Sequence, residues 1–309
     1  SSGTVMNPDY MKRFVGWTPE EVDGIHGLAV FDGKLYAIPM YHQGLFRYDG
    51  GTGWTDCGTP GCRLMSLTVF NGHLYGAGNE GNKRGGVYRY DGGTVWTRTG
   101  DQAGVDQTYA FAVHEGRLHS GTWPEATVFR YEGGETWTKR GRLGNELEVM
   151  GMAVYNGKLY AGTLPLAEVY RYDGAETWTR TGRLDTTPNV RYRRAWSMAV
   201  YQGRLFCGTL PSGHVYSLEA GKSVTYDHEL GAGWRHLAAV RSGDRLKLYV
   251  DGELAATSSA FPPGDYDLSN PCPLRIGFGA HDYFNGRMRD LRLYDRALTD
   301  REAAALFRA

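Results

Sequence analysis

The sequence predicts an all-β fold: a β-propeller of five four-stranded blades, followed by a smaller β-rich part. Three observations support this prediction. A repeat of about 40 residues occurs five times between residues 24 and 230. Within each copy, short apolar segments alternate with tight-turn dipeptides. After Leu230 the repeat stops and a different sequence pattern begins, which separates the C-terminal part.

The copy Gly151–Gly182 shows the pattern most clearly. We expect strands at Met152–Tyr155 and Lys158–Ala161, joined by an Asn-Gly turn. A Gly-Thr-Leu-Pro loop leads to a third strand at Glu168–Tyr172, and an Asp-Gly turn leads to a fourth that carries Trp178. A four-stranded meander cannot bury both faces alone, so the copies must stack on one another as propeller blades do.

The glycines of the first turn set the register of the five copies. They are Gly33, Gly72, Gly116, Gly157 and Gly203, and the intervals between them are 39, 44, 41 and 46 residues. Such intervals are typical of four-stranded propeller repeats. Val250-Asp251-Gly252 and Phe284-Asn285-Gly286 also look like blade turns, so a ring of six or seven blades is the alternative.

The predicted boundaries are 1–23 for an N-terminal segment, 24–230 for the propeller and 231–309 for the C-terminal part. Phe14–Thr18 is similar to the last strand of a repeat. We expect it to close the ring by completing the fifth blade, whose own fourth strand is degenerate. The polar start, Ser1–Asp9, is typical of an internal cut and indicates a piece of a larger multidomain chain.

Composition argues against two classes of partner. Thirty-four Lys and Arg residues balance 34 Asp and Glu residues, so no overall field favours nucleic acid or an anionic membrane. No apolar run approaches the ~18 residues that span a bilayer, so we expect no membrane insertion. Four cysteines in a Gly-rich β protein favour an extracellular or cell-surface location, with free buried thiols as the alternative. Cys57 and Cys62 bracket a loop that a disulfide could close.

Four copies place an acidic residue five positions before a tryptophan, as Asp49 and Trp54 do; the other pairs are Asp91 and Trp96, Glu132 and Trp137, and Asp173 and Trp178. This pattern resembles the Asp-box hairpin of sialidase- and kelch-type propellers, S-x-D-x-G-x-x-W, with Arg in the first position. The resemblance implies a scaffold role, in which the carboxylate accepts backbone N–H bonds across the turn and the Trp packs between blades. It implies no sialidase activity, because no arginine triad can be assigned.

Ligand-binding residues are expected on loops at one face of the propeller, near its axis. Aromatic rings mixed with carboxylates and Arg suit a sugar, because rings stack on pyranose faces and charged planar groups bind hydroxyls. The candidate ligand-binding residues are Tyr41, His42, Tyr109, Trp123, Glu125, Arg193, Arg194 and Trp196.

The segment Leu184–Trp196 is basic and aromatic and departs from the repeat. A fork of Arg193 and Arg194 would suit a carboxylate or sulfate, with a solvated loop of incidental charge as the alternative. Acids that could act near the axis are Asp23, Asp106 and Glu148. Carboxylates occur in almost every loop, so the sequence assigns no catalytic residue.

The C-terminal part contains WRHLAAV, LYVDGEL, LRIG, FNGRMRDLRLYDRAL and a final T-x-x-E. In this order the pieces resemble the C-terminal half of the laminin-G-like, concanavalin A-like jelly roll. The resemblance implies a partial β-sandwich and makes Ca²⁺ plausible, but no Asp and Asn cluster has a convincing ligand spacing, so we expect no metal or other cofactor. A short helix is expected at Thr299–Leu306, with Thr299 or Asp300 as its N-cap. Three explanations stay open for the other half of the jelly roll. Strands around Val215–Asp227 supply it, or it lies outside this chain. Alternatively, the strands of the C-terminal part are further propeller blades and there is no jelly roll to complete.

Three functions fit these features. The first is an extracellular glycan-binding protein that takes part in polysaccharide recognition or degradation. The second is a carbohydrate-active enzyme, a glycoside hydrolase or polysaccharide lyase, with an active site at the axis. The third is a protein–protein interaction scaffold. An enzyme would require a raised pKa for Asp23, Asp106 or Glu148 in a closed axial pocket.

Overall fold

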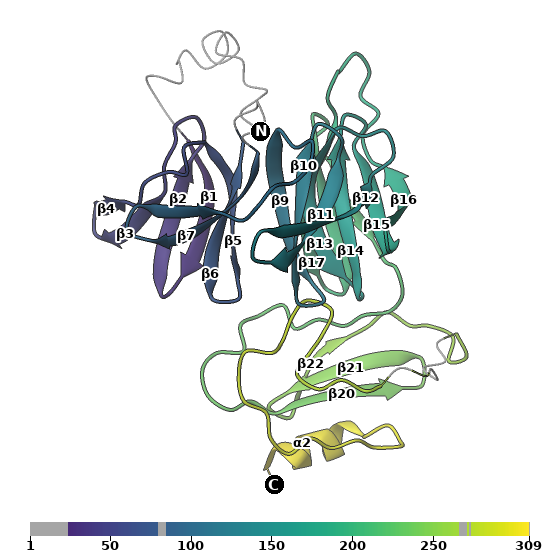
Figure 1. The fold of residues 1–309 in the computed structure, drawn as a ribbon. Coiled ribbons are helices and arrows are strands. Elements are labelled where there is room, and N and C mark those ends of the chain that lie inside the picture. Colours follow the sequence, from purple (N-terminus) through teal and green to yellow (C-terminus); the bar gives the residue numbers. More distant parts are fainter. Residues whose placement is uncertain (1–23, 80–84, 266–270, 272, 309) are drawn as a thin grey trace.

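A computed structural model describes residues 24–79, 85–265, 271 and 273–308. The chain is an all-β propeller, as predicted, with six small antiparallel sheets of three or four strands. Figure 1 shows five sheets side by side in the upper part of the molecule and the sixth beneath them. The predicted strand Phe14–Thr18 and the candidate Asp23 lie outside the described residues.

Strand order follows the sequence in every sheet. The first sheet contains β1 (Ile25–Phe31), β2 (Lys34–Pro39), β3 (Phe46–Gly50) and β4 (Gly53–Asp56). The second contains β5 (Leu64–Phe70), β6 (His73–Gly78), β7 (Gly86–Gly92) and β8 (Val95–Arg98). The third contains β9 (Gln107–His114), β10 (Arg117–Trp123), β11 (Thr127–Gly133) and β12 (Thr136–Arg142). The fourth contains β13 (Glu148–Tyr155), β14 (Lys158–Leu164), β15 (Glu168–Gly174) and β16 (Thr177–Arg183). The fifth contains β17 (Arg194–Tyr201), β18 (Arg204–Leu210) and β19 (Val215–Leu218).

Local sequence explains how the sheets form and stack. The Asn-Gly turn between β13 and β14 places Asn156 at φ 45° and Gly157 at φ 75°, as a two-residue hairpin requires. The first strands of consecutive sheets contact one another, from β1 through β5, β9 and β13 to β17. Gly162 allows the close approach of the fourth and fifth sheets, because a Cβ there would clash with the carbonyl oxygen of Ala195.

The acidic residues of the repeat bind side chains. Asp91 accepts hydrogen bonds from Arg89 Nε at 2.6 Å and from Thr97 Oγ1 at 2.5 Å. The Arg and Thr at the equivalent positions bind Asp49, Glu132 and Asp173 in the same way. These partners differ from the backbone N–H groups that the Asp-box resemblance implied. The Arg in the first position explains the difference, because its guanidinium donates to the carboxylate oxygens that backbone N–H groups would otherwise use.

The tryptophans connect neighbouring sheets, as predicted. Trp137 Nε1 donates to the carbonyl oxygen of Thr99 in the preceding sheet at 2.7 Å. Equivalent bonds join Trp96 to Cys57 and Trp178 to Arg140. Trp54 is in the first sheet and is 45% exposed.

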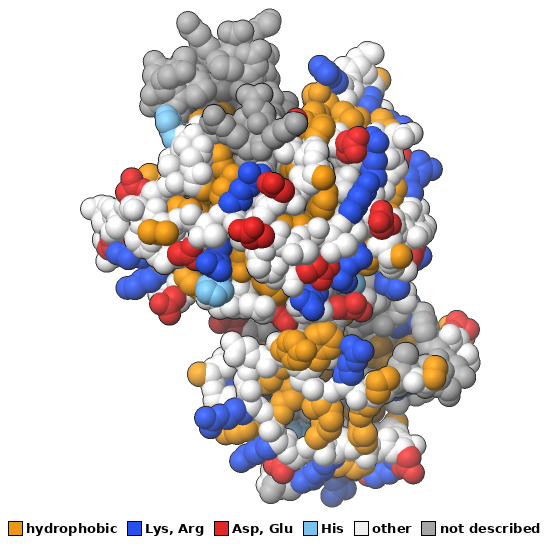
Figure 2. All heavy atoms as spheres, viewed as in Figure 1, with side chains coloured by type: hydrophobic (Ala, Val, Ile, Leu, Met, Phe, Trp, Pro, Cys, Tyr) orange, Lys and Arg blue, Asp and Glu red, His pale blue; other side chains and the backbone are white. Residues whose placement is uncertain are grey.

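The C-terminal module contains β20 (Leu237–Ser242), β21 (Arg245–Val250), β22 (Glu253–Thr257) and α2 (Asp300–Arg308). Its sheet lies beneath the five others, so it is not a sixth blade (Figure 1). The segments Pro273–Gly279 and Phe284–Ala297 contain no named strand, only a bridge between Phe278 and Tyr283. Figure 2 shows hydrophobic side chains gathered over this module.

Helix α2 begins as predicted. Thr299 Oγ1 accepts the backbone N–H of Glu302 at 3.2 Å, and the Glu302 carboxylate accepts the backbone N–H of Thr299 at 2.8 Å. This reciprocal pair is a capping box, with Thr299 as the N-cap.

The module packs against the first-hairpin turns of the propeller. Backbone N–H groups of Glu115 and Gly116 donate to the carbonyl oxygens of Ala280 and His281 at 2.8 and 2.9 Å. Asn156 Nδ2 donates to the carbonyl oxygen of Ala220, which precedes the module, at 2.5 Å. The first-hairpin turns of the third and fourth sheets are therefore covered by the chain that follows β19, and the loops that enter each first strand lie at the opposite end of the propeller.

Cysteine pairing is absent among the described residues. Cys57, Cys62 and Cys207 are buried and form no disulfide with one another, whereas Cys272 lies outside the described residues. The loop between Cys57 and Cys62 is therefore closed by other contacts. One of these is the hydrogen bond from Thr59 Oγ1 to the carbonyl oxygen of Cys62 at 3.1 Å.

Candidate functional site

The same irregularity occurs near the start of all five first strands. The register of each strand with its neighbour shifts by one residue, which is a β-bulge. A bulge leaves an extra residue unpaired and changes the direction of its side chain. In each copy the bulge includes the residue seven positions before the turn glycine, and these residues are His26, Met65, Tyr109, Met150 and Trp196. We call them the bulge layer.

The bulge layer meets at the centre of the propeller. The Tyr109 ring contacts the His26 ring at 6.2 Å and the Trp196 ring at 6.4 Å, both nearly perpendicular. These three residues come from the first, third and fifth sheets, which are not neighbours in the stack. Met65 and Met150 are buried in the same cluster as Tyr109, with Trp196 packed against it. Aromatic rings and methionines therefore occupy the axis.

A polar layer lies two residues earlier on the same strands. The residues nine positions before the turn glycines are Gly24, Arg63, Gln107, Glu148 and Arg194. Glu148 and Arg194 are each only 2% exposed, although both are ionisable. Long charged side chains are rarely buried without a partner, so this layer is unusual.

Several polar atoms of the two layers have no hydrogen-bond partner among the described residues. They are Oε1 of Glu148, Nε and Nη2 of Arg194, and the Tyr109 hydroxyl. Arg194 makes one weak bond, from Nη1 to the carbonyl oxygen of Tyr192 at 3.4 Å. Leaving a buried donor or acceptor unpaired costs about 1–3 kcal/mol. Buried polar atoms without a partner require an explanation in a native protein, and a bound ligand that pairs with them is one such explanation.

Burial also changes the ionisation of these groups. Burial raises the pKa of Glu148 from 4.5 to about 8, although the nearby Arg194 charge opposes the shift. Burial lowers the pKa of Arg194 and raises that of Tyr109. Burial, with a smaller effect of Arg63, lowers the pKa of His26 to about 4. At neutral pH the carboxyl of Glu148 is therefore protonated and His26 is neutral, so arginines carry the charge of the axial cluster.

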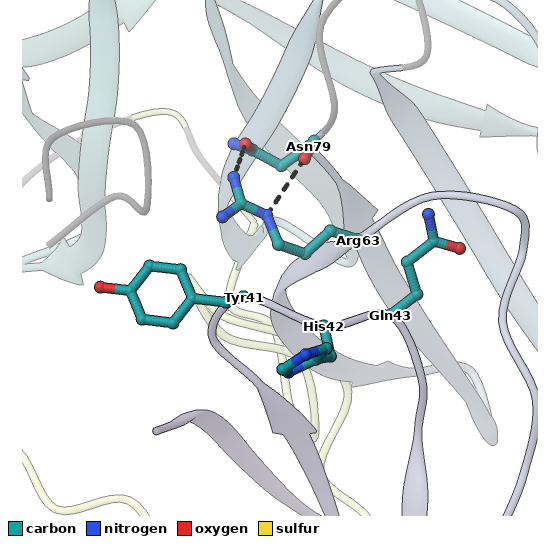
Figure 3. A pocket seen from close by; sticks show the side chains of 5 residues that line it. All are labelled: Tyr41, His42, Gln43, Arg63 and Asn79. Atoms are coloured by element: carbon teal, nitrogen blue, oxygen red, sulfur yellow. Dashed lines mark hydrogen bonds between the residues drawn. The ribbon is translucent and has the colours of Figure 1, made fainter. Parts of the chain in front are cut away.

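An open pocket of about 430 Å³ lies beside the polar layer (Figure 3). Arg63 is shared by both, and its guanidinium donates to Asn79 Oδ1 at 2.9 Å and to the carbonyl oxygen of Met40 at 3.1 Å. Figure 3 shows the Tyr41 ring projecting away from Gln43. The remaining lining residue is His42.

The structure thus does not bring the eight candidate residues together in one place. Tyr109, Arg194 and Trp196 meet at the axis, and Tyr41 and His42 line the adjacent pocket. Trp123 is half-buried at the end of β10, packed against the same cluster as Tyr109.

The remaining two candidates make contacts elsewhere. Glu125 is exposed and lies 3.8 Å from Arg142 in an ion pair. Arg193 Nε donates to the carbonyl oxygen of Thr187 at 2.7 Å, within its own loop. Arg193 and Arg194 therefore bind different groups, and only Arg194 belongs to the axial cluster.

The candidate ligand-binding residues omitted Arg63, Met65 and Met150, which the structure places in the two layers, and Glu148 was predicted only as an acid near the axis. The sequence contains a signal for all four. When the copies are aligned on their turn glycines, each layer occupies one column of the alignment. Methionine was not among the residue types expected of a sugar site, so Met65 and Met150 were not predicted, although Tyr109 and Trp196 of the same column were.

The comparison with protein families supports the C-terminal resemblance. A laminin-G family model, described as the concanavalin A-like lectin/glucanases superfamily, matches residues 175–304. The matched range begins in the fourth sheet and includes the fifth sheet and the C-terminal module. No curated protein sequence matches the chain.

Solved structures with a similar fold are distant in sequence. The extracellular domain of a B. thetaiotaomicron protein described as a hybrid two-component system is 15% identical, with a TM-score of 0.51 over 78% of this chain and 35% of that one. Virginiamycin B lyase from Staphylococcus aureus is 13% identical, with a TM-score of 0.47 over 77% and 84%. A gluconolactonase from Xanthomonas campestris is 19% identical, with a TM-score of 0.43 over 59% and 68%. At these identities the likeness is one of fold alone.

Two kinds of feature are absent from the described residues. None of their helices is long and apolar enough to cross a membrane. Nor do three or more His, Cys, Asp or Glu side chains of the described ranges converge to hold a metal ion.

Proposed function

We propose that this protein binds glycans outside the cell and that its axial cluster is the recognition site. One observation carries the proposal: Tyr109, Glu148 and Arg194 keep buried, unpaired hydrogen-bonding atoms next to the Trp196 ring. A ligand that fills this place would satisfy donors and acceptors that otherwise cost free energy.

A sugar matches the chemistry of this cluster. Its apolar C–H face stacks on an aromatic ring, and Tyr109 and Trp196 supply such rings. Its hydroxyls both donate and accept hydrogen bonds. Arg194 provides donors only, whereas the Tyr109 hydroxyl and the protonated Glu148 carboxyl can donate and accept. A purely apolar ligand would leave all of these groups unpaired.

The comparisons support the setting of the proposal. The concanavalin A-like match extends over the C-terminal module, and one of the similar structures is an extracellular domain. We infer that the C-terminal module, which lies under the propeller, assists recognition, while the axial cluster binds the sugar.

A second candidate function rests on Glu148. A carboxyl group with its pKa raised to about 8 is protonated at neutral pH and can act as a general acid. The protein would then be a carbohydrate-active enzyme that protonates a leaving oxygen. Binding is the better supported function, because the only charged group that perturbs Glu148 among its described neighbours is Arg194, and not a second carboxylate.

The experiment that tests both functions uses the purified chain with neutral, uronic-acid and sulfated polysaccharides on a calibrated size-exclusion column. Co-elution with uncut polymer supports glycan binding. Shortened polymer, lost in Glu148→Gln, supports the enzyme. If the chain and every polymer elute independently, the proposed glycan function is wrong.

A further inference from the structure

We propose that the axial site takes an acidic sugar, that Arg194 binds its carboxylate, and that Arg63 adds positive charge beside the site. This inference rests on the proposed glycan function and specifies the ligand class of the same site. It predicts that a uronic acid binds better than the same sugar without its negative charge.

The Arg194 guanidinium has the geometry for a carboxylate. Its unpaired atoms, Nε and Nη2, are adjacent and carry the parallel N–H donors of one edge of the guanidinium plane. Two parallel donors match the two oxygens of a carboxylate in a bidentate pair. The guanidinium carbon lies 5.8 Å from the centre of the Tyr192 ring and 5.7 Å from that of Trp196. These rings support the guanidinium on two sides and keep its donor edge in place.

The charge of Arg194 is not compensated by a described residue. On the outer strands, arginines form ion pairs with their own acids, as Arg89 does with Asp91 at 2.6 Å and Arg171 with Asp173 at 2.7 Å. Glu148 is the one acid of the polar layer, and burial keeps it protonated at neutral pH. A buried cation without a counterion is costly, so an anionic ligand group would be bound strongly.

Arg63 adds a second positive charge on the far side of the layer. It comes from the second sheet, whereas Arg194 comes from the fifth, and its charge acts on both Tyr109 and His26. Asn79 and the Met40 carbonyl orient Arg63 at the wall of the open pocket, so its charge lies beside that pocket. Positive charge at this wall attracts anions and disfavours cations.

The test is isothermal titration calorimetry of the full chain with trigalacturonate and with its fully methyl-esterified form. The ester replaces each carboxylate with a neutral methyl ester, so the two probes share one sugar chain and differ in charge and in one methyl group per sugar. We expect the acid to bind about tenfold or more tightly than the ester, as a lost charge-assisted pair predicts. In Arg194→Gln this ratio should fall to about one. In Arg117→Gln, an exposed arginine at the start of β10 whose guanidinium donates to the Glu132 carbonyl oxygen, the ratio should persist.

Arg194 is buried, so its variant is checked by circular dichroism and thermal unfolding. If it does not fold, Arg63→Gln takes its place and should reduce the same ratio. Equal affinity for acid and ester, a preference for sulfated over uronic oligosaccharides, or a ratio that survives both substitutions would overturn the inference. A chain that binds neutral polymers but not trigalacturonate would refute this inference and leave the glycan function intact. A chain that binds no glycan would refute both.

Discussion

At the residue scale, Glu148 determines the chemistry of the axis. It is a carboxylic acid placed where water cannot solvate its charge, and the folded protein retains its proton over a pH range in which the unfolded chain loses it. Glu148 thus avoids the charge that it would carry in water, whereas Arg194 is a buried guanidinium whose Nε and Nη2 have no partner among the described residues. The polar layer therefore stores unfavourable free energy that a ligand can relieve.

This arrangement predicts an unusual pH dependence of stability. Between pH 4.5 and about 8 the unfolded chain has released the Glu148 proton and the folded chain has not, so the free energy of unfolding falls as pH rises. The slope from this group is about 1.4 kcal/mol per pH unit. His26, with its pKa lowered to about 4, has the opposite effect below pH 6.5, so the informative range is pH 6.5 to 8. Urea unfolding should show that Glu148→Gln gains stability over the original protein as pH rises through this range.

Parallel stability profiles for the two proteins would contradict this explanation of Glu148. A matched control is Glu125→Gln, because Glu125 is exposed and forms only a long ion pair. Its profile should follow that of the original protein throughout.

The sequence identified single residues of the site but not their arrangement. Tyr109, Arg194 and Trp196 were predicted because rings and arginines suit sugars. Whether Arg193 or Arg194 faces the axis depends on the start of β17 at Arg194, which the sequence alone does not determine. Burial of Glu148 is likewise a product of five strands meeting, since its neighbours come from distant parts of the chain.

At the element scale, the first four blades repeat one set of contacts. In each of them an acid binds the Arg two residues before it and the Thr six residues after it. In the second, third and fourth blades the tryptophan of the fourth strand also donates to a carbonyl oxygen at the preceding sheet. The Asn-Gly and Asp-Gly turns predicted these hairpins correctly, because such dipeptides fix the local backbone. The β-bulges were not predicted, because a bulge is a property of the pairing between two strands and not of one strand's sequence.

The tryptophan contacts between sheets predict a difference between two equivalent residues. Trp137→Phe should lose the hydrogen bond to Thr99 and lower the free energy of unfolding by about 1–3 kcal/mol. Trp54→Phe should cost less than about 1 kcal/mol, because Trp54 is in the first sheet and is 45% exposed. Chemical denaturation of both variants measures the difference. An equal loss would show that the bond between sheets contributes nothing measurable.

At the scale of the whole molecule, the two ends of the propeller differ. The first-hairpin turn of the third sheet contacts the C-terminal module, and the polar layer lies toward the opposite end of the first strands. The five-sheet propeller followed from the repeat, whereas the irregular course of Pro273–Gly279 and Phe284–Ala297 did not. A segment that resembles a strand of a known family forms that strand only where the neighbouring strands with which it pairs are also present.

Two turn glycines test the contact between propeller and module. Gly116 and Gly72 both have φ near 70°, so alanine introduces similar backbone strain at each. A Cβ at Gly116 would lie 3.1 Å from the Phe278 ring, whereas none lies within 4 Å at Gly72. Hydrogen exchange of residues 278–283 should therefore accelerate in Gly116→Ala and remain unchanged in Gly72→Ala. Equal exchange in both variants would show that the module does not depend on this turn.

The central claim is that the axial cluster recognises a glycan, and the measurement that tests it most directly is the affinity of Trp196→Ala for the polysaccharide that binds the original protein. Trp54→Ala serves as the matched control, because it removes an exposed tryptophan of the first sheet. We expect Trp196→Ala to weaken binding about tenfold or more while Trp54→Ala leaves it unchanged. Full affinity in a folded Trp196→Ala variant would contradict the claim and place the binding site elsewhere on the chain.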